Sequence, residues 1–380
     1  VVAWSLNDRI RGNDAALGAL VSAFPNTGFL GVPLLVALLG LFGVSAVSAE
    51  NIRLRIASGH PAVNTYVNLM QNFFVPEVSK RVAARTQHKV EFVEGYGGSM
   101  VKVADTLEGV QSGLIDIGGY CFCFEASNLP LNAFLVMLPF GTMNSETSVK
   151  LARSVYDKVP ALSKVFEDKY NQQLIALISD NGYNIGTTFE WNNISDLKGK
   201  KIAGAGLNLK WLEYAGVTPV QSTLPDGYTA LQTGVYSGWV MFPSAWVNFK
   251  FYEVAKNYTE VGFGAITWHG LTINKNRMAK LPKDVQAIII EVAKEFEAKT
   301  GSVNQENYPK QVAQLKTLGV NVKSVPEAVK LDWANSLKDW PQAMASDLDA
   351  RGMPGSLVLK TTLEEAEKMG HKWPVRYVIK

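Results

Sequence analysis

The sequence of 380 residues contains only two cysteines, Cys121 and Cys123, which are separated by a single residue. This spacing is not that of a zinc site or of a thioredoxin-type redox motif. On a strand, residues i and i+2 point to the same face, and a bridge between them would be strained. We therefore expect two buried thiols that have no chemical role.

Signatures of catalysis are also missing from the chain. It has no G-x-S-x-G, H-E-x-x-H or P-loop, and Gly204-Ala205-Gly206 lacks the third glycine of a dinucleotide fingerprint. The histidines His60, His88, His269 and His371 are widely spaced, so they do not indicate a metal site. These absences favour binding without catalysis, cofactor or metal, and an enzyme with an unrecognised site is the alternative.

Basic residues do not cluster, and the formal net charge of the chain is only +3. Because no basic stripe with interleaved aromatic residues occurs, we do not expect a nucleic acid as a partner. The composition, 47% hydrophobic and 19% charged, is that of a globular protein. A chain of this length is long enough for two domains, each with its own core.

The first 49 residues differ from the rest, since no charged residue occurs between Asp14 and Glu50. An apolar stretch at 34–44 is followed by small residues at 45–49, which is the pattern of a signal peptide. We predict cleavage after Ala49 and export to the periplasm. No Lys or Arg directly precedes the apolar stretch, and residues 15–34 faintly resemble a segment of the auxin-efflux-carrier transporters. The alternatives are an extraneous N-terminal segment and an uncleaved membrane anchor.

Two distant segments share one local pattern. Residues 101–112 and 228–233 have apolar residues at helical spacing, and each ends in Gln-Ser or Gln-Thr followed by Gly113 or Gly234. Glycine adopts the left-handed conformation that ends a helix at little steric cost, and a β-rich run follows each glycine. A helix–glycine–strand unit used twice predicts two similar α/β lobes. The cleft between such lobes is a common place for a small ligand.

The hydrophobic periodicity predicts strands alternating with helices throughout residues 50–330, typical of an α/β fold with mostly parallel strands. No linker rich in Pro, Gly or Ser separates two halves, so we expect the chain to cross between the lobes more than once. Strands are predicted at 52–58, 90–94, 114–120, 174–178, 183–188, 202–205, 266–273 and 320–325, and helices at 61–85, 145–159, 207–215, 246–256 and from 282 to about 318.

Six short motifs in a fixed order resemble the solute-binding proteins of tripartite ATP-independent periplasmic (TRAP) transporters, over residues 51 to about 325. They are Leu107-x-x-Val110-Gln111-x-Gly113-x-x-Asp116-Ile117-Gly118, Leu138-Pro139-Phe140, Asp196-Leu197-Lys198-Gly199-x-Lys201-Ile202, Tyr228-x-Ala230-Leu231-Gln232-Thr233-Gly234-Val235, Phe251-Tyr252-Glu253-Val254 and Leu281-Pro282-x-Asp284-Val285-Gln286. The resemblance implies a two-lobed periplasmic binding protein fold with crossing hinge strands and a long helix that spans both lobes. It also implies capture of a small solute for delivery to a membrane permease.

The chain departs from this family at the residues that hold the ligand. Most members bind a ligand carboxylate with an arginine directly after the Lys-Ile pair, and this position is Ala203 here. A second arginine of some members would fall near Asn184. Because leaving one partner of a buried ion pair alone costs roughly 3–5 kcal/mol, the ligand either lacks a carboxylate there or meets another donor. Lys210, His60, His269 and amides at a helix N-terminus are the available substitutes.

Aromatic residues replace polar ones at the end of the second lobe's motif. The segment Trp239-Val240-Met241-Phe242-Pro243 occupies the position at which relatives place a polar ligand contact. We therefore predict ligand contacts for Trp239 and Phe242, with Tyr120 nearby, and expect rings to stack on the ligand or to hold a cation. Asn64 matches a position where relatives often place a ligand-binding asparagine.

These inferences together predict the periplasmic binding component of a TRAP-type transporter for a small organic solute, such as an aromatic or hydrophobic acid. The alternatives are a neutral or cationic ligand in an aromatic cage, and a periplasmic sensor that reports to a signalling partner. We expect one lobe at 50–178 plus about 265–300, a second lobe at 179–264 plus about 301–330, and a helical C-terminal tail at 331–380.

Overall fold

The computed structural model describes residues 49–380. The predicted signal peptide, its cleavage site and the alternatives for residues 1–48 therefore lie outside the described part of the chain. Within that part, the helices are all too short or too polar to cross a membrane.

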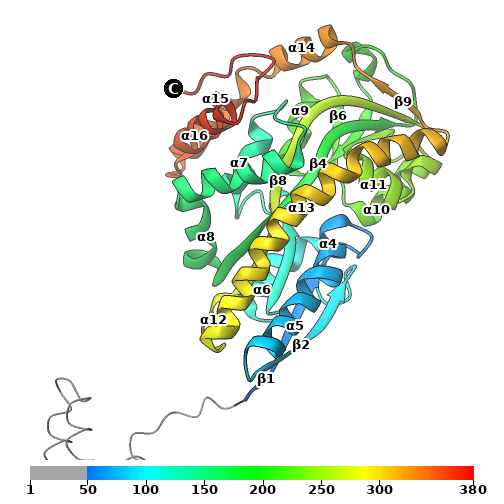
Figure 1. The fold of residues 1–380 in the computed structure, drawn as a ribbon. Helices are drawn as coiled ribbons and strands as arrows, with labels where there is room; N and C mark the ends of the chain where they lie inside the picture. The colour runs from blue at the N-terminus through cyan, green and yellow to red at the C-terminus, as the bar shows by residue number, and fades with distance from the viewer. Residues whose placement is uncertain (1–48) are drawn as a thin grey trace, which may run out of the picture. The chain divides into compact units, whose positions relative to one another are not determined.

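Nine strands within residues 49–380 form one mixed sheet, in the order β2-β1-β3-β8-β4-β7-β5-β6, with β9 on a free part of β8 (Figure 1). Neighbours are parallel except for the three pairs β3–β8, β8–β4 and β4–β7. The strands are β1 (Asn51–Ser58), β2 (Lys89–Tyr96), β3 (Ile117–Cys121), β4 (Gln172–Thr187), β5 (Lys201–Gly204), β6 (Thr218–Gln221), β7 (Gly238–Met241), β8 (Asn257–Asn274) and β9 (Asn321–Ser324).

Two long antiparallel strands, β4 and β8, belong to both halves of the sheet. In the first half, β3 pairs with residues 269–273 of β8. In the second half, β7 pairs with residues 184–187 of β4, and β9 pairs with residues 257–260 of β8. This arrangement confirms the predicted two-lobed α/β fold with crossing strands.

The middle of this strand pair is irregular. The β4–β8 register shifts at Ile178/Ser179, Ser179/Gly182 and Tyr183/Ile185, which leaves Asp180 and Asn181 without a paired residue on β8. The strands predicted at 174–178 and 183–188 are parts of the single strand β4, and the strand predicted at 266–273 is the end of the longer β8, so the break in β4 and the length of β8 were predicted wrongly. Polar residues at 179–181 resemble a turn in the sequence, but in the structure they form bulges inside one strand.

The helices cover both halves of the sheet, and the longest of them, α13, runs along both (Figure 1). They are α4 (Thr65–Leu69), α5 (Val75–Arg85), α6 (Thr106–Ser112), α7 (Ser145–Lys158), α8 (Ala161–Tyr170), α9 (Leu209–Glu213), α10 (Leu224–Gln232), α11 (Pro243–Asn248), α12 (Lys275–Ala279), α13 (Lys283–Thr317), α14 (Glu327–Ser336), α15 (Trp340–Ala350) and α16 (Gly355–Lys368). The long helix predicted from residue 282 to about 318 is thereby confirmed.

Side chains of α13 replace the hydrogen bonds that the irregular part of β4 lacks. Asn304 Nδ2 donates to the backbone oxygen of Ser179 at 2.7 Å, and the Ser179 amide donates to Thr300 Oγ1 at 3.2 Å. Asn184 Nδ2 donates to the Tyr308 hydroxyl at 2.9 Å. Buried backbone groups need such partners, so α13 stabilises the bulged conformation.

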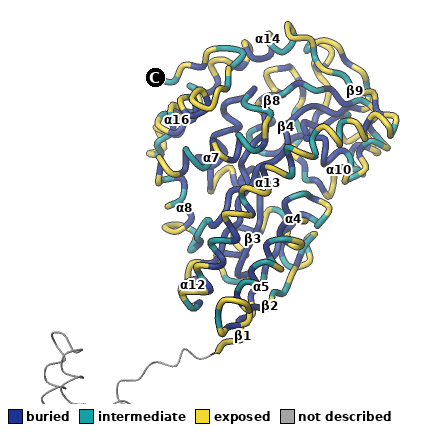
Figure 2. Tube along the Cα trace, viewed as in Figure 1, coloured by how far each residue is buried: buried dark blue, intermediate teal, exposed yellow. Residues whose placement is uncertain are grey.

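Buried residues follow the strands and the inner faces of the helices (Figure 2). One apolar cluster lies around β1 and α5 and includes Phe74 and Phe296. A larger one includes Trp211 and Trp333 and also takes in residues of 129–166. The sequence had placed 129–166 in the first lobe, and the residue bounds of the lobes and of the tail stay a prediction.

Both predicted glycine stops occur. Gly113 (φ 77°) follows α6 and Gly234 (φ 74°) lies just beyond α10, and the strands β3 and β7 come soon after them. Two predicted helices differ from the structure. The helix predicted from Pro61 begins at Thr65, since Asn64 caps it, and includes a π-helical turn at Met70–Phe74. The helix predicted at 246–256 ends at Asn248, and Lys250 (φ 58°) reverses the chain.

We predict that Asn304→Ala lowers the free energy of unfolding by about 1–3 kcal/mol, because it leaves the buried Ser179 oxygen without a donor. Glu306→Ala, on an exposed turn of the same helix, removes only a surface ion pair with Lys310 and should cost about 0.5 kcal/mol or less. Urea denaturation measures both values. Equal losses in the two variants would show that α13 does not support the irregular part of β4.

Candidate functional site

A small cavity lies where the carboxyl ends of strands from both halves of the sheet meet. Its walls follow the ends of β1 and β3 in the first half and the ends of β5, β6 and β7 in the second. Ligands of α/β proteins bind at this side of the strands. The lining residues are His60, Asn64, Cys121, Cys123, Phe124, Tyr183, Ala205, Asn208, Ser222, Leu224, Trp239, Met241, Phe242, Trp268 and His269.

Aromatic rings make up much of the wall. Tyr183 is at the centre of one group, with its ring edge-to-face against Phe242 and Trp268 at centroid distances of 5.2 and 5.9 Å. The free space is small, about 30 Å³. This is far below the 300 Å³ or more of typical ligand sites, so a ligand of several atoms requires the walls to move apart.

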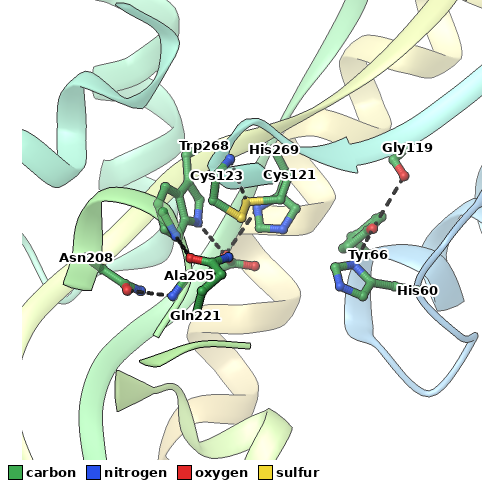
Figure 3. The surroundings of a disulfide bond; sticks show 12 residues. His60, Tyr66, Gly119, Cys121, Cys123, Ala205, Asn208, Gln221, Trp268 and His269 are labelled. Atoms are coloured by element: carbon green, nitrogen blue, oxygen red, sulfur yellow. Dashed lines mark hydrogen bonds and ion pairs between the residues drawn. A yellow bond between two sulfur atoms is a disulfide. The ribbon is translucent and has the colours of Figure 1, made fainter. Parts of the chain in front are cut away.

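Cys121 and Cys123 form a disulfide that lies in the cavity wall beside His269 and Trp268 (Figure 3). The expectation of two free thiols was therefore wrong. It assumed that both residues lie on one strand, whereas β3 ends at Cys121 and the chain enters a 3₁₀ turn at Phe122–Phe124. The turn brings the two Cα atoms to 5.1 Å, within the usual range for a disulfide.

His60 lies two residues after the end of β1 and is almost fully buried. Its Nδ1 is 2.9 Å from the Tyr66 hydroxyl, which is in turn 2.9 Å from Ser58 Oγ. Its other ring nitrogen, Nε2, is buried without a hydrogen-bond partner. Burial, with a smaller contribution from His269, lowers the pKa of His60 to about 3, and Asp180 opposes the shift only in part. His60 is therefore a neutral imidazole at neutral pH.

Asp180, in the irregular part of β4, contacts three side chains that line the cavity. Its Oδ2 accepts hydrogen bonds from the Tyr183 hydroxyl at 3.0 Å and from Trp268 Nε1 at 3.1 Å. His269 Nδ1 lies 3.2 Å from the same oxygen, an ion-pair contact that is not aligned as a hydrogen bond. Burial, followed by the charge of Asp180, raises the pKa of Tyr183, so its phenol stays protonated. The Asp180 carboxylate therefore orients three side chains that line the cavity.

Trp239 lies on β7 and presents a second unpartnered donor. Its ring is buried, stacks on Phe251 at 5.4 Å, and lies close to Gly227, where no larger residue would fit. Its Nε1 has no hydrogen-bond partner. Trp191 Nε1 and Trp373 Nε1 are also buried without a partner, but of these three tryptophans only Trp239 lines the cavity, so its N–H is a candidate donor to a ligand.

Five of the nine residues predicted to bind ligand line the cavity: His60, Asn64, Trp239, Phe242 and His269. Contact of these residues with a ligand stays a prediction.

The structure places the other four elsewhere. The Tyr120 hydroxyl donates to Gln172. The side-chain nitrogen and oxygen of Asn184 both make hydrogen bonds within the fold, to Tyr308 and from the Gly262 amide. Ala203 is buried inside β5, and Lys210 is on the outer surface, paired with Glu213.

The sequence analysis missed several lining residues, above all Tyr183, Trp268 and the disulfide. Tyr183 and Trp268 lie on strands that looked like ordinary core, and neither belongs to one of the six motifs. In the structure both side chains line the cavity, and their polar atoms donate hydrogen bonds to the buried Asp180. A polar run such as Ser179-Asp180-Asn181 between two apolar strand segments was the available signal.

The profile of the bacterial extracellular solute-binding proteins of family 7 matches residues 68–347, and the chain belongs to this family. A monocarboxylate 2-oxoacid-binding periplasmic protein of Nostoc sp. is 26% identical over 289 residues, which are 73% of this chain and 74% of that protein. A solute-binding protein of Sulfitobacter sp. is 33% identical over 107 residues, but the match covers only 26% of this chain and 31% of that relative.

A solved structure has the same fold at low identity. The TRAP solute-binding protein of Rhodoferax ferrireducens, crystallised with copurified benzoate, superposes with a TM-score of 0.74 at 20% identity. The alignment covers 84% of this chain and 98% of that structure. The protein is thus an extracellular solute-binding protein of family 7, with the fold of the TRAP periplasmic solute-binding proteins.

We predict that Gly206→Ala destabilises the protein more than Gly199→Ala, by at least about 1 kcal/mol, because only the first overpacks the cavity wall. Both glycines have positive φ, 55° and 73°, so both substitutions strain the backbone. A Cβ at Gly206 would meet the Cys123 carbonyl at 2.4 Å, whereas nothing lies within 4 Å of one at Gly199. Urea denaturation tests the difference, and equal losses would contradict the close contact.

Proposed function

We propose that this protein captures a small monocarboxylic acid with an aromatic or apolar body and delivers it to a TRAP permease. The observation that carries the proposal is the cavity itself, which combines aromatic walls with two buried nitrogen atoms that have no partner, His60 Nε2 and Trp239 Nε1. A ligand that places its carboxylate at those nitrogens and its body among the rings would complete the site. The likeness to a 2-oxoacid-binding and a benzoate-bound protein supports this class of ligand.

Burial of the ligand's apolar surface supplies most of the binding energy in this proposal, at about 25 cal/mol per Å² of area removed from water. The hydrogen bonds fix its polar end, and each bond to a charged group contributes about 1.5–3 kcal/mol. Among the residues that the structure describes, no Arg or Lys lines the cavity. In this proposal, the indole of Trp239 and the histidines His60 and His269 therefore act as the donors in place of a guanidinium.

The same ligand would join the two lobes, since the residues that hold it belong to both halves of the sheet. A ligand that contacts both lobes stabilises the closed arrangement, and a permease can recognise that state. Export by a cleaved N-terminal signal peptide belongs to this proposal. The Cys121–Cys123 disulfide supports an oxidising compartment such as the periplasm.

A neutral or cationic ligand is the second candidate, and the absence of Arg and Lys from the described cavity walls favours it. A neutral ligand would use the same donors without requiring a balancing charge. A cation would be held by ring faces, at about 0.5–2 kcal/mol per contact.

Thermal unfolding with a panel of compounds separates these candidates. We expect benzoate, mandelate or pyruvate to raise the melting temperature, with a stabilisation of about 2.7 kcal/mol at a concentration one hundred times the dissociation constant. Dicarboxylates, sugars and quaternary amines are the comparison set. A shift with sugars or quaternary amines alone would replace the monocarboxylate proposal with the second candidate.

Trp239→Phe should weaken monocarboxylate binding about tenfold or more, because it removes an N–H that donates to a charged group. Trp246→Phe is the matched control, since Trp246 is equally buried but lies outside the cavity wall and donates to the Ala255 oxygen. Isothermal titration calorimetry measures both affinities. If the two variants bind equally well, Trp239 is a residue of the core and not of the site.

A further inference from the structure

The charge of a bound carboxylate has to be balanced inside this cavity. Placing an unpaired carboxylate in a buried site is costly, and the groups around it normally supply hydrogen bonds and an opposite charge. Among the described lining residues, the side chains able to carry a positive charge are His60 and His269. Their ring centroids are 6.5 Å apart, a separation that allows one small anionic group to approach both.

The surroundings of the two imidazoles differ. The Tyr66 hydroxyl lies at His60 Nδ1, and burial holds His60 in its neutral form. His269 has the Asp180 carboxylate 3.2 Å from its Nδ1. Figure 3 shows His269 beside the disulfide, with His60 and Tyr66 on its other side.

The other titratable groups near His269 cannot supply the charge. Tyr66 on α4 and Tyr183 on β4 are phenols whose pKa burial raises, so both stay neutral. Asp180 is a hydrogen-bond acceptor for Tyr183 and Trp268. The Cys121–Cys123 disulfide next to the ring does not titrate.

We propose that His269 binds the carboxylate through Nε2 and is protonated in the complex, while neutral His60 donates from its own Nε2. The inference rests on the proposed monocarboxylate ligand. A carboxylate on both nitrogens adds a second negative group beside His269, so binding favours the protonated ring and takes up a proton when that ring is neutral beforehand. Affinity is therefore highest at low pH and falls as pH rises, by at most tenfold per pH unit for one proton.

Calorimetric titration with benzoate and with pyruvate tests this inference, in two buffers of the same pH but different ionisation enthalpy. The wild-type protein should take up as much as one proton per ligand, and its affinity should fall as the pH rises. His269→Gln should bind at least tenfold more weakly and lose both the proton uptake and the pH dependence. His60→Gln should bind more weakly but keep the proton uptake.

His371→Gln is the control, because His371 contacts the Phe140 oxygen away from the cavity and should change neither affinity nor proton uptake. Asp180→Asn gives a second variant if His269→Gln does not fold, and it should move the fall in affinity to lower pH. Benzoate or pyruvate binding without proton uptake, unchanged in His269→Gln, would overturn the inference and leave the proposed function intact. If neither acid binds the wild-type protein, the proposed function falls and the inference falls with it.

Discussion

The antiparallel pairing of β4 with β8 is the constraint on which the rest of the structure depends. Each half of the sheet is hydrogen-bonded to one end of these two strands, so the irregular middle sets how the lobes face each other. Asp180 lies in that middle, and its carboxylate contacts Tyr183, Trp268 and His269 in the cavity wall. The segment that connects the lobes and the segment that shapes the site therefore share a residue. A ligand that changes the contacts of Asp180 acts directly on the connection.

The site has to solve one electrostatic problem without a guanidinium. Ala203 carries no charge and is buried, and Asn184 is already used to join β4 to α13. Buried polar atoms without partners destabilise a fold, so His60 Nε2 and Trp239 Nε1 are retained at a cost that a ligand would remove. In the proposed site, the aromatic walls would select the apolar body of the acid. Under this proposal, the aromatic rings select the ligand and the imidazoles bind its carboxylate.

Features encoded locally could be predicted from the sequence, whereas features that depend on distant contacts could not. The glycine stops at Gly113 and Gly234, the long helix α13 and the family all follow from short-range patterns. The single strand β4 could not be predicted, since Ser179-Asp180-Asn181 is typical of a turn and only α13 stabilises it as a bulge. The disulfide depends on a change of backbone direction at Cys121. The place of Tyr183 and Trp268 in the cavity wall could be recognised only in the structure, where both donate to Asp180.

The account's central claim is that one cavity between the lobes holds an acid by imidazole and indole nitrogens and surrounds it with rings. A crystal structure of the protein with benzoate or pyruvate tests this most directly. We expect the carboxylate within hydrogen-bond distance of His60 Nε2, His269 Nε2 and Trp239 Nε1, with the body of the acid against Phe242. A carboxylate bound to a lysine or arginine outside these walls, or a ligand away from this cavity, would contradict the account.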